Sequence, residues 1–367
     1  MKIDYREKRI LGKSGVAVTR LVFGTSGFGG FLRLRKWDEV LAVGKALTQR
    51  FGCGITWDSA NMYGAGIALE NTGDLIRELG IQSTSEVINK PGWVIIEPPP
   101  GVPIDKFEPG LWRGLTKTIR YAQTREQMRE SIDQGLELLG PGIDAPLCSA
   151  HDFHKLARMI AHTPDLFLGD RLLTTDPNAL MYDQLLPALA EKRAEGAIKG
   201  VGLGMMDWCL MREIITRSGV IDYVMLANEF TILRHDPELL DFIEWLRAQG
   251  IGLIAAAPYN AAWIFGSTEK IDGFTDPTAE QLAWRAKFLQ VCAEMRAEPA
   301  AVAVQFVFSN PCVDAVAPGS ARVAHIDRNF PQNPDGSDFV IPSRVWARLI
   351  AEGVIRKDYR YKDQLLG

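Results

Sequence analysis

The feature that most restricts the fold of this chain is a regular alternation of short apolar runs with longer helical patterns. Apolar runs typical of buried strands lie near residues 21–23, 54–58, 85–89, 143–150, 198–203, 222–227, 251–256 and 313–317. Helical patterns lie near residues 37–50, 66–79, 124–140, 179–196, 207–218, 237–249, 278–297 and 322–330. About eight strands, each followed by a helix and joined by right-handed crossovers, predict an α/β fold with a single parallel (β/α)8 TIM barrel.

Three segments fall outside this alternation. Residues 8–23 predict an N-terminal hairpin that leads into the first strand. Residues 91–122, after the third strand, are rich in Pro and Gly and too long for an ordinary connection, so we expect a loop insertion over the active site. Its aromatic residues either stack on a substrate or fix the loop to the barrel. Residues 341–353 predict an extra C-terminal helix packed on the barrel, and the whole chain, 1–367, reads as one domain.

Composition argues against several classes of protein. With 367 residues, 47% of them hydrophobic, the chain can bury a large core. Its formal charge of -4, from 41 basic and 45 acidic residues, makes nucleic acid and anionic membranes poor candidates for partners. The first residues contain no apolar leader and no uncharged apolar run approaches membrane-spanning length, so we expect a cytoplasmic protein. Five scattered cysteines suggest neither a disulfide framework nor a zinc site.

Four residues with proton-handling side chains follow consecutive apolar runs. Asp58 ends one run and Tyr63 follows shortly after it, while Lys90 and His151 end the next two runs. In a (β/α)8 barrel the reactive groups lie at the carboxyl ends of the strands, so we expect these side chains to face one cavity. Each residue alone has an ordinary alternative as a surface, turn or packing residue. The ordered set is what favours a catalytic site.

The four side chains together can carry out carbonyl reduction or its reverse. An ammonium close to a phenol favours the ionised phenol, so Lys90 is expected to bring the pKa of Tyr63 toward neutrality, with Asp58 orienting the lysine. His151 is expected to donate a hydrogen bond to the substrate oxygen. The hydride must come from a cofactor, because no side chain supplies it.

In order and spacing, these residues resemble the Asp, Tyr, Lys and His tetrad of the aldo-keto reductases. The similarity extends over most of the chain, at residues 21–25, 57–64, 89–92, 150–152, 200–204, 228–233, 305–311 and 318–320. Within that superfamily the chain looks most like the branch of D-threo-aldose 1-dehydrogenase, L-fucose dehydrogenase and pyridoxal 4-dehydrogenase. The long run after Lys90, the Pro258-Tyr-Asn260 motif and the Ile-Pro-x-x-x-Trp start of the terminal helix carry this closer likeness.

The resemblance implies a nicotinamide dinucleotide, NAD or NADP, bound without a Rossmann domain. By residue matching, Gly24 and Thr25 would line the nicotinamide end, and Asp58, Pro258 and Asn260 are further expected cofactor-binding residues. Gly319, Ser320 and Arg322 would hold the phosphates, and His325 and Asn329 would contact the adenine. Met206 stands where the branch has an asparagine and Ala227 where many members have a glutamine, so Asn228 or a main-chain group would have to replace them. Gly319 occupies the place of a lysine typical of NADP enzymes, which leaves both dinucleotides open.

The resemblance also sets the expected function. We expect an oxidoreductase that interconverts a small polar aldehyde or aldose and its alcohol or lactone. Four tryptophans either line a sugar-sized pocket or serve as packing residues: Trp93, Trp112, Trp208 and Trp263. Two alternatives remain, a barrel that binds the dinucleotide as a sensor and a redox-neutral sugar-modifying enzyme that retains its cofactor. The sequence does not indicate the oligomeric state or the stereochemistry of the substrate.

Overall fold

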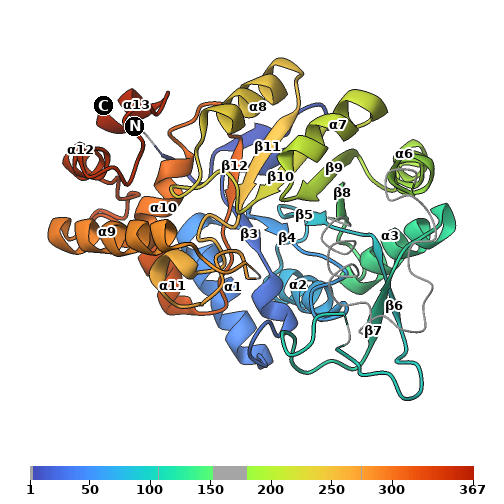
Figure 1. Ribbon diagram of the computed structural model, residues 1–367. Helices are drawn as coiled ribbons and strands as arrows, with labels where there is room; N and C mark the ends of the chain where they lie inside the picture. Colours follow the sequence, from blue (N-terminus) through green and yellow to red (C-terminus); the bar gives the residue numbers. More distant parts are fainter. Residues whose placement is uncertain (1–2, 106, 152–179, 274) are drawn as a thin grey trace.

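A computed structural model describes residues 3–105, 107–151, 180–273 and 275–367, apart from the side chain of His151. Eight strands form one parallel sheet in the order β12-β11-β10-β9-β8-β5-β4-β3 (Figure 1). Their bounds are β3 (Val22–Gly24), β4 (Thr56–Asp58), β5 (Glu86–Asn89), β8 (Leu147–His151), β9 (Gly200–Met205), β10 (Tyr223–Ala227), β11 (Gly252–Ala256) and β12 (Ala315–Ala317). All eight coincide with the apolar runs expected to form strands.

The sheet closes on itself where the first and last strands meet. Leu21 and Val316 form a parallel bridge, and Gly24 and Gly319 form a second one at the other end of the seam. The backbone N–H of Val316 donates to the carbonyl of Arg20 at 2.9 Å. Because the edges pair in this way, the predicted (β/α)8 barrel is confirmed.

Helices surround the barrel at the positions expected from the sequence (Figure 1). They are α1 (Trp37–Phe51), α2 (Ile67–Glu78), α3 (Arg125–Leu139), α6 (Leu186–Ala194), α7 (Trp208–Ser218), α8 (Pro237–Ala248), α9 (Ala279–Met295) and α11 (Val323–Asn329). Several begin at a residue whose side chain caps the first turn. The side chain of Thr124 accepts from the N–H of Gln127, and that of Asp207 accepts from Leu210. Such caps satisfy backbone donors that have no partner within the helix.

The amino-terminal end of the barrel is closed by the predicted hairpin of β1 (Lys8–Ile10) and β2 (Ala17–Thr19). Leu11, Val16 and Val18 from this hairpin pack into the barrel interior with inward-facing residues of the strands. Gly12, with φ of 54°, lies very close to the backbone of Asp222, because an added Cβ would be 1.9 Å from its carbonyl oxygen. The hairpin therefore closes the amino-terminal end of the barrel and leaves the carboxyl-terminal end open for a site.

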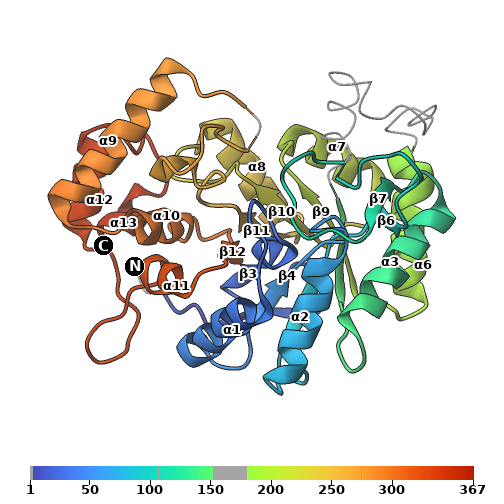
Figure 2. The same ribbon diagram turned by 90° about the horizontal axis from the view of Figure 1, so that it is seen from below.

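Two regions differ from the sequence-based expectation. Residues 91–122 are not only loop, because they contain an antiparallel pair, β6 (Trp93–Ile96) and β7 (Thr118–Tyr121). A helix that was not predicted, α10 (Pro299–Val307), follows α9. The expected terminal helix is present as α12 (Ser343–Ala351), followed by the short α13 (Lys362–Leu366). Figure 2 shows the β6–β7 pair beside α3 and α6, with α12 and α13 across the barrel from it.

Among the residues that the structure describes, none of the helices combines the length and the apolarity that crossing a bilayer requires.

Candidate active site

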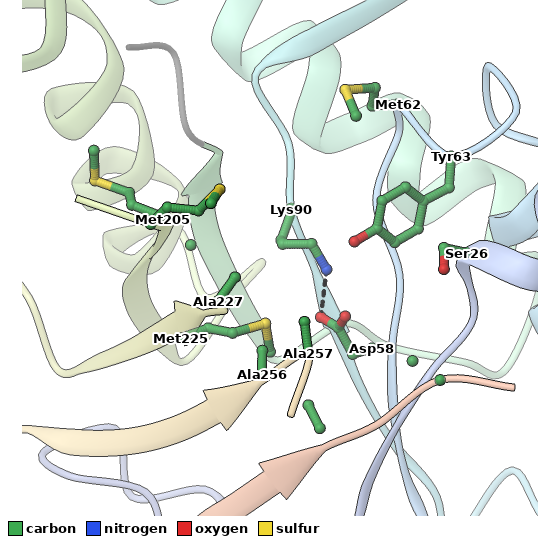
Figure 3. Close-up of a pocket in the computed structure, with 15 residues that line it drawn as sticks. Ser26, Asp58, Met62, Tyr63, Lys90, Met205, Met225, Ala227, Ala256 and Ala257 are labelled. Carbon is green, nitrogen blue, oxygen red and sulfur yellow. Dashed lines mark hydrogen bonds and ion pairs between the residues drawn. The ribbon is translucent and has the colours of Figure 1, made fainter. Parts of the chain in front are cut away.

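A pocket of about 230 Å³ opens at the carboxyl ends of the barrel strands (Figure 3). It brings Asp58, Tyr63 and Lys90 together. The lining residues are Gly24, Ser26, Asp58, Met62, Tyr63, Lys90, Gly204, Met205, Met206, Met225, Ala227, Ala256, Ala257, Ala317 and Gly319. Polar groups thus gather on one side of the pocket, and methionine and alanine side chains form much of the rest.

The centre of the polar side is an ion pair between neighbouring strands. Asp58 is the last residue of β4 and Lys90 directly follows β5. Lys90 Nζ lies 2.5 Å from Asp58 Oδ1 and donates a second hydrogen bond to the carbonyl of Ser59 at 2.9 Å. Each of the two residues is only 4% exposed. In Figure 3 the Lys90 ammonium and the Tyr63 hydroxyl point toward the same space.

Tyr63 contacts this pair through its ring and its hydroxyl. Lys90 Nζ lies 4.8 Å from the centroid of the Tyr63 ring. Burial alone would lower the pKa of Lys90, but Asp58 and Tyr63 outweigh it and raise that pKa, so the ammonium stays charged. Burial raises the pKa of Tyr63 even though Lys90 opposes the change. The expected lowering of the Tyr63 pKa is therefore wrong in direction, and the phenol is protonated at neutral pH.

A buried polar network links the segment between Asp58 and Tyr63 to the lysine strand. Asn89 Nδ2 donates to Asn61 Oδ1 at 3.0 Å, and Asn61 Nδ2 donates to the carbonyl of Ser131 at 2.7 Å. Gly135 on α3 lies against these amides, since an added Cβ would be 2.2 Å from Asn89 Nδ2. Helix α3 thus helps to hold the two loops that carry the polar groups.

The strand ends place the backbone of His151 next to this pocket. Strand β8 ends at His151, which pairs with Gly204, a lining residue. The side chain of His151 lies outside the described part of the structure, so its expected role stays a prediction.

The residues expected at the nicotinamide end lie around the same mouth. Gly24, Met206 and Ala227 line the pocket. Gly319, which was expected at the phosphates, lines it as well. The Thr25 hydroxyl donates to the carbonyl of Asp58 at 3.0 Å and is buried.

Two asparagines lie on the loops after β10 and β11. Asn260 Nδ2 donates to the carbonyl of Asn228 at 2.9 Å, and Pro258 is buried nearby in sequence. The side-chain carbonyl oxygens of Asn228 and Asn260 are buried and accept no hydrogen bond from any residue described here. Unsatisfied buried acceptors of this kind fit a ligand that brings an amide donor, as the nicotinamide carboxamide does.

Apart from Gly319, the residues expected at the phosphate and adenine end are not among the pocket lining. The Ser320 hydroxyl lies 3.2 Å from His325 Nδ1, Arg322 is exposed, and Asn329 is buried on α11. Burial and a neighbouring Arg33 lower the pKa of Arg35, Glu39 opposes the change, and Arg322 adds weakly to the lowering. Three guanidinium groups thus gather around the single carboxylate of Glu39, which pairs with Arg33 and Arg35. A surplus of guanidinium groups fits a phosphate-bearing ligand.

The four tryptophans proposed for a substrate pocket are not among the residues that line the described cavity. Trp112 stacks on Tyr63, with ring centroids 5.8 Å apart. Trp93 packs edge to face with Tyr121 in the β6–β7 pair, and Trp208 packs against Phe242. Trp263 is fully buried beneath Arg285. Their contact with a substrate stays a prediction.

Most of the apolar lining was not predicted from the sequence. The missed residues are Ser26, Met62, Gly204, Met205, Met225, Ala256, Ala257 and Ala317. Strand periodicity could have found some of them, because side chains two residues apart face the same side of a strand. Met225 and Ala227 on β10 have this spacing and both line the pocket.

The fold and the pocket define a class of protein: a closed parallel barrel that carries a buried Asp-Lys-Tyr site at the carboxyl ends of its strands. Comparison with known proteins makes the class specific. The model of the aldo/keto reductase family matches residues 20–335, and the chain belongs to this family. It is accordingly an oxidoreductase, and membership implies a nicotinamide dinucleotide as cofactor, NAD or NADP.

Curated relatives match nearly the whole chain at low identity. Pyridoxal 4-dehydrogenase of Microbacterium luteolum is 28% identical, covering 97% of this chain and 100% of the relative. D-threo-aldose 1-dehydrogenase of a Pseudomonas species is 23% identical, covering 92% and 94%. L-galactose dehydrogenase of Arabidopsis thaliana is 21% identical, covering 88% and 86%. A solved thermostable aldo-keto reductase in complex with the inhibitor epalrestat shares the fold, with a TM-score of 0.60 at 17% identity, covering 95% and 100%.

Proposed function

We propose that this protein interconverts a small polar aldehyde or aldose and its alcohol or lactone, with Tyr63 as the acid and base. The observation that supports this most is the buried contact of the Lys90 ammonium with both the Asp58 carboxylate and the Tyr63 ring. A phenol beside a charged ammonium can release a proton and leave a stabilised phenolate.

The residues of the chain account for the proton in this reaction. A bound nicotinamide dinucleotide supplies the hydride to the carbonyl carbon or accepts it in reverse. In reduction, the Tyr63 hydroxyl donates its proton to the carbonyl oxygen and becomes a phenolate, which Lys90 stabilises. In oxidation, Tyr63 first loses its own proton to solvent, and the resulting phenolate takes the proton of the substrate hydroxyl. Asp58 keeps Lys90 charged and in place, and His151 is proposed to orient the substrate oxygen.

The residues proposed to hold the dinucleotide surround this proton-handling site. Gly24, Thr25 and Asn228 are proposed for the nicotinamide end, where the unsatisfied oxygen of Asn228 supports the assignment. Ser320 and Arg322 are proposed for the phosphates. The substrate class is suggested by the relatives, whose names specify pyridoxal, D-threo-aldoses and L-galactose.

A direct test follows the absorbance of the reduced dinucleotide with purified protein. Oxidation of NADH or NADPH is measured with a panel of aldehydes including pyridoxal, and reduction of NAD or NADP with aldoses including L-galactose. We expect turnover with at least one aldehyde or aldose. Dinucleotide binding without an absorbance change for any compound would contradict the proposal.

A second candidate function is a dinucleotide-binding sensor without turnover. It is favoured by Met206 and Ala227, which line the pocket where related enzymes are expected to carry amide side chains. A redox-neutral sugar-modifying enzyme is the third. That activity would convert a sugar with no net absorbance change while a dinucleotide stays bound through purification.

A further inference from the structure

The ring of Tyr63 is held by the insertion that precedes β7. Trp112 stacks on this ring with centroids 5.8 Å apart and an interplanar angle of 28°. The Trp112 indole N–H donates to Glu108 Oε2 at 2.7 Å, so the carboxylate fixes the orientation of the indole. Trp112 is 4% exposed and Glu108 is 5% exposed. A stacked ring pair of this kind stabilises the orientation of both rings.

We propose that Trp112, held by Glu108, is a positioning residue that fixes the Tyr63 phenol for proton transfer. This inference rests on the proposed role of Tyr63. It gives the insertion a part in the proton chemistry, where the sequence suggested only a substrate contact or a structural anchor. Trp112 is not a catalytic residue in this account, because it acts through Tyr63.

The insertion is itself tied to the barrel beside Tyr63. Phe31 and Trp112 form an antiparallel bridge, and their rings pack with centroids 5.3 Å apart. The N–H of Leu32 donates to the carbonyl of Leu111 at 2.6 Å, and that of Arg113 donates to Gly30 at 3.1 Å. Trp112 is therefore anchored by backbone pairing as well as by its side chain.

Glycines allow this close packing around Tyr63. An added Cβ on Gly29 would lie 2.8 Å from the carbonyl carbon of Tyr63, and one on Gly64 would lie 2.2 Å from the carbonyl oxygen of Gly29. An added Cβ on Gly30 would lie 2.3 Å from the carbonyl oxygen of Arg113. The loop after β3 thus contacts the Tyr63 backbone, while the insertion contacts the Tyr63 ring. The phenol is held from two segments that lie far apart in sequence.

The charge of Glu108 adds an electrostatic effect to the positioning. Burial raises the pKa of Tyr63 most, Lys90 opposes it, and Asp58 and Glu108 add to the increase. Removing the charge of Glu108 while keeping an acceptor for the indole should therefore lower the pKa of Tyr63. A merely structural residue would not shift this titration.

The experiment compares three variants with one matched control. Trp112→Leu removes the stacked ring, Trp112→Phe keeps a ring, and Glu108→Gln keeps an oxygen acceptor but removes the charge. Trp284→Leu is the control, because Trp284 also stacks on a ring, that of Phe288, and donates its N–H to one acceptor, the carbonyl of Val354 at 2.9 Å. Trp284 belongs to α9, outside the pocket.

With an aldehyde substrate, we expect Trp112→Leu to lower kcat about 10- to 100-fold and to leave the KM of the aldehyde within about twofold. Trp112→Phe should recover most of kcat, and Trp284→Leu should match wild type. A raised KM with unchanged kcat in Trp112→Leu would make Trp112 a substrate contact and overturn the inference. Circular dichroism checks folding, and Trp112→Phe still tests the role of the ring if Trp112→Leu does not fold.

Two further measurements separate this inference from the role of Tyr63 itself. The first introduces Trp112→Leu into Tyr63→Phe, where it should cause no additional loss of kcat. An equal loss in both backgrounds overturns the inference, whereas full activity of Tyr63→Phe alone overturns the proposed function. The second titrates tyrosinate absorbance, taking the difference between proteins with and without Tyr63. Glu108→Gln should move this titration to lower pH, and an unchanged titration would contradict the role of Glu108.

Discussion

Lys90 Nζ lies 2.5 Å from Asp58 Oδ1 at the mouth of the barrel, and both residues are almost completely buried. A buried ion pair of this kind adds little to stability compared with an apolar pair, but removing one partner leaves an uncompensated charge. The pair is therefore best understood as part of the catalytic site. Mutation can separate its contribution to turnover from its contribution to stability.

Lys90→Met should abolish turnover and also destabilise the fold by about 3 to 5 kcal/mol, because Asp58 is left buried without its partner. The double variant Asp58→Asn/Lys90→Met should regain most of that stability while remaining inactive. Urea denaturation and steady-state kinetics of the single and double variants test this. Recovery of activity in the double variant would show that the ammonium is not needed.

Tyr63→Phe should lower turnover at least about 100-fold and leave dinucleotide affinity near that of wild type, since only the acid and base is lost. Fluorescence titration with the reduced dinucleotide measures affinity, and initial rates measure turnover. Because the pKa of Tyr63 is raised, reduction by wild type should show no Tyr63-linked loss between neutral pH and about pH 9. Unchanged turnover in Tyr63→Phe would remove this residue from the mechanism.

Gly135→Ala should disturb the network of Asn61 and Asn89, because its Cβ would lie 2.2 Å from Asn89 Nδ2. We expect a loss of about 1 to 3 kcal/mol in stability together with a lower kcat. Gly44→Ala is the matched control on α1, where the three atoms nearest to the new Cβ would all belong to the side chain of Leu75. That control should lose stability and keep kcat. If the two variants have the same kcat, the network does not hold the site.

His235 should make stability depend on pH. It lies between the rings of Phe306 and Tyr359, and its Nε2 accepts from the N–H of Arg356 at 3.0 Å. Burial lowers its pKa from 6.5 to about 4, so the unfolded chain binds the proton more readily than the folded one. The stability that neutral His235 permits is complete above pH 6.5 and is lost as pH falls toward about 4.

The test is His235→Gln, which keeps an acceptor for Arg356 and does not titrate. Between neutral pH and about pH 4.5, wild type should lose about 2 to 3 kcal/mol more unfolding free energy than the variant. Equal losses in the two proteins would show that His235 does not contribute to the acid sensitivity.

Arg322→Gln should weaken NADPH binding about 10-fold and leave NADH binding unchanged, because a 2′-phosphate would meet the guanidinium groups gathered near Arg322. Fluorescence titration with the two dinucleotides gives the comparison. Arg328→Gln is the control, since Arg328 is exposed and paired with Glu298 at 3.2 Å. Equal weakening of both dinucleotides by Arg322→Gln would exclude a contact with the 2′-phosphate.

The barrel could be predicted from the sequence because its strands are buried on both faces and are therefore nearly continuous apolar runs. The same apolar runs also predicted the positions of Asp58 and Lys90, because each of these residues lies at the carboxyl end of one run. Helix α10 could not be recognised in this way. It is buried on all sides, and an evenly apolar helix shows no amphipathic period.

The rest of the site depends on contacts between distant segments. The pairing of Trp93 with Tyr121 in β6–β7 spans a Pro- and Gly-rich stretch, which by itself predicts only a loop. The pKa of Tyr63 could not be judged either. Sequence shows the neighbouring lysine, but only the folded structure shows that burial outweighs it.

Gly24 and Gly319 pair across the seam where the barrel closes, and this pairing determines when activity can appear during synthesis. These glycines line the pocket from the two ends of the barrel sequence, so a nascent chain carries Asp58, Tyr63 and Lys90 long before it can enclose them. Activity must therefore arise late in synthesis, only after the last strand has emerged from the ribosome and docked against the first.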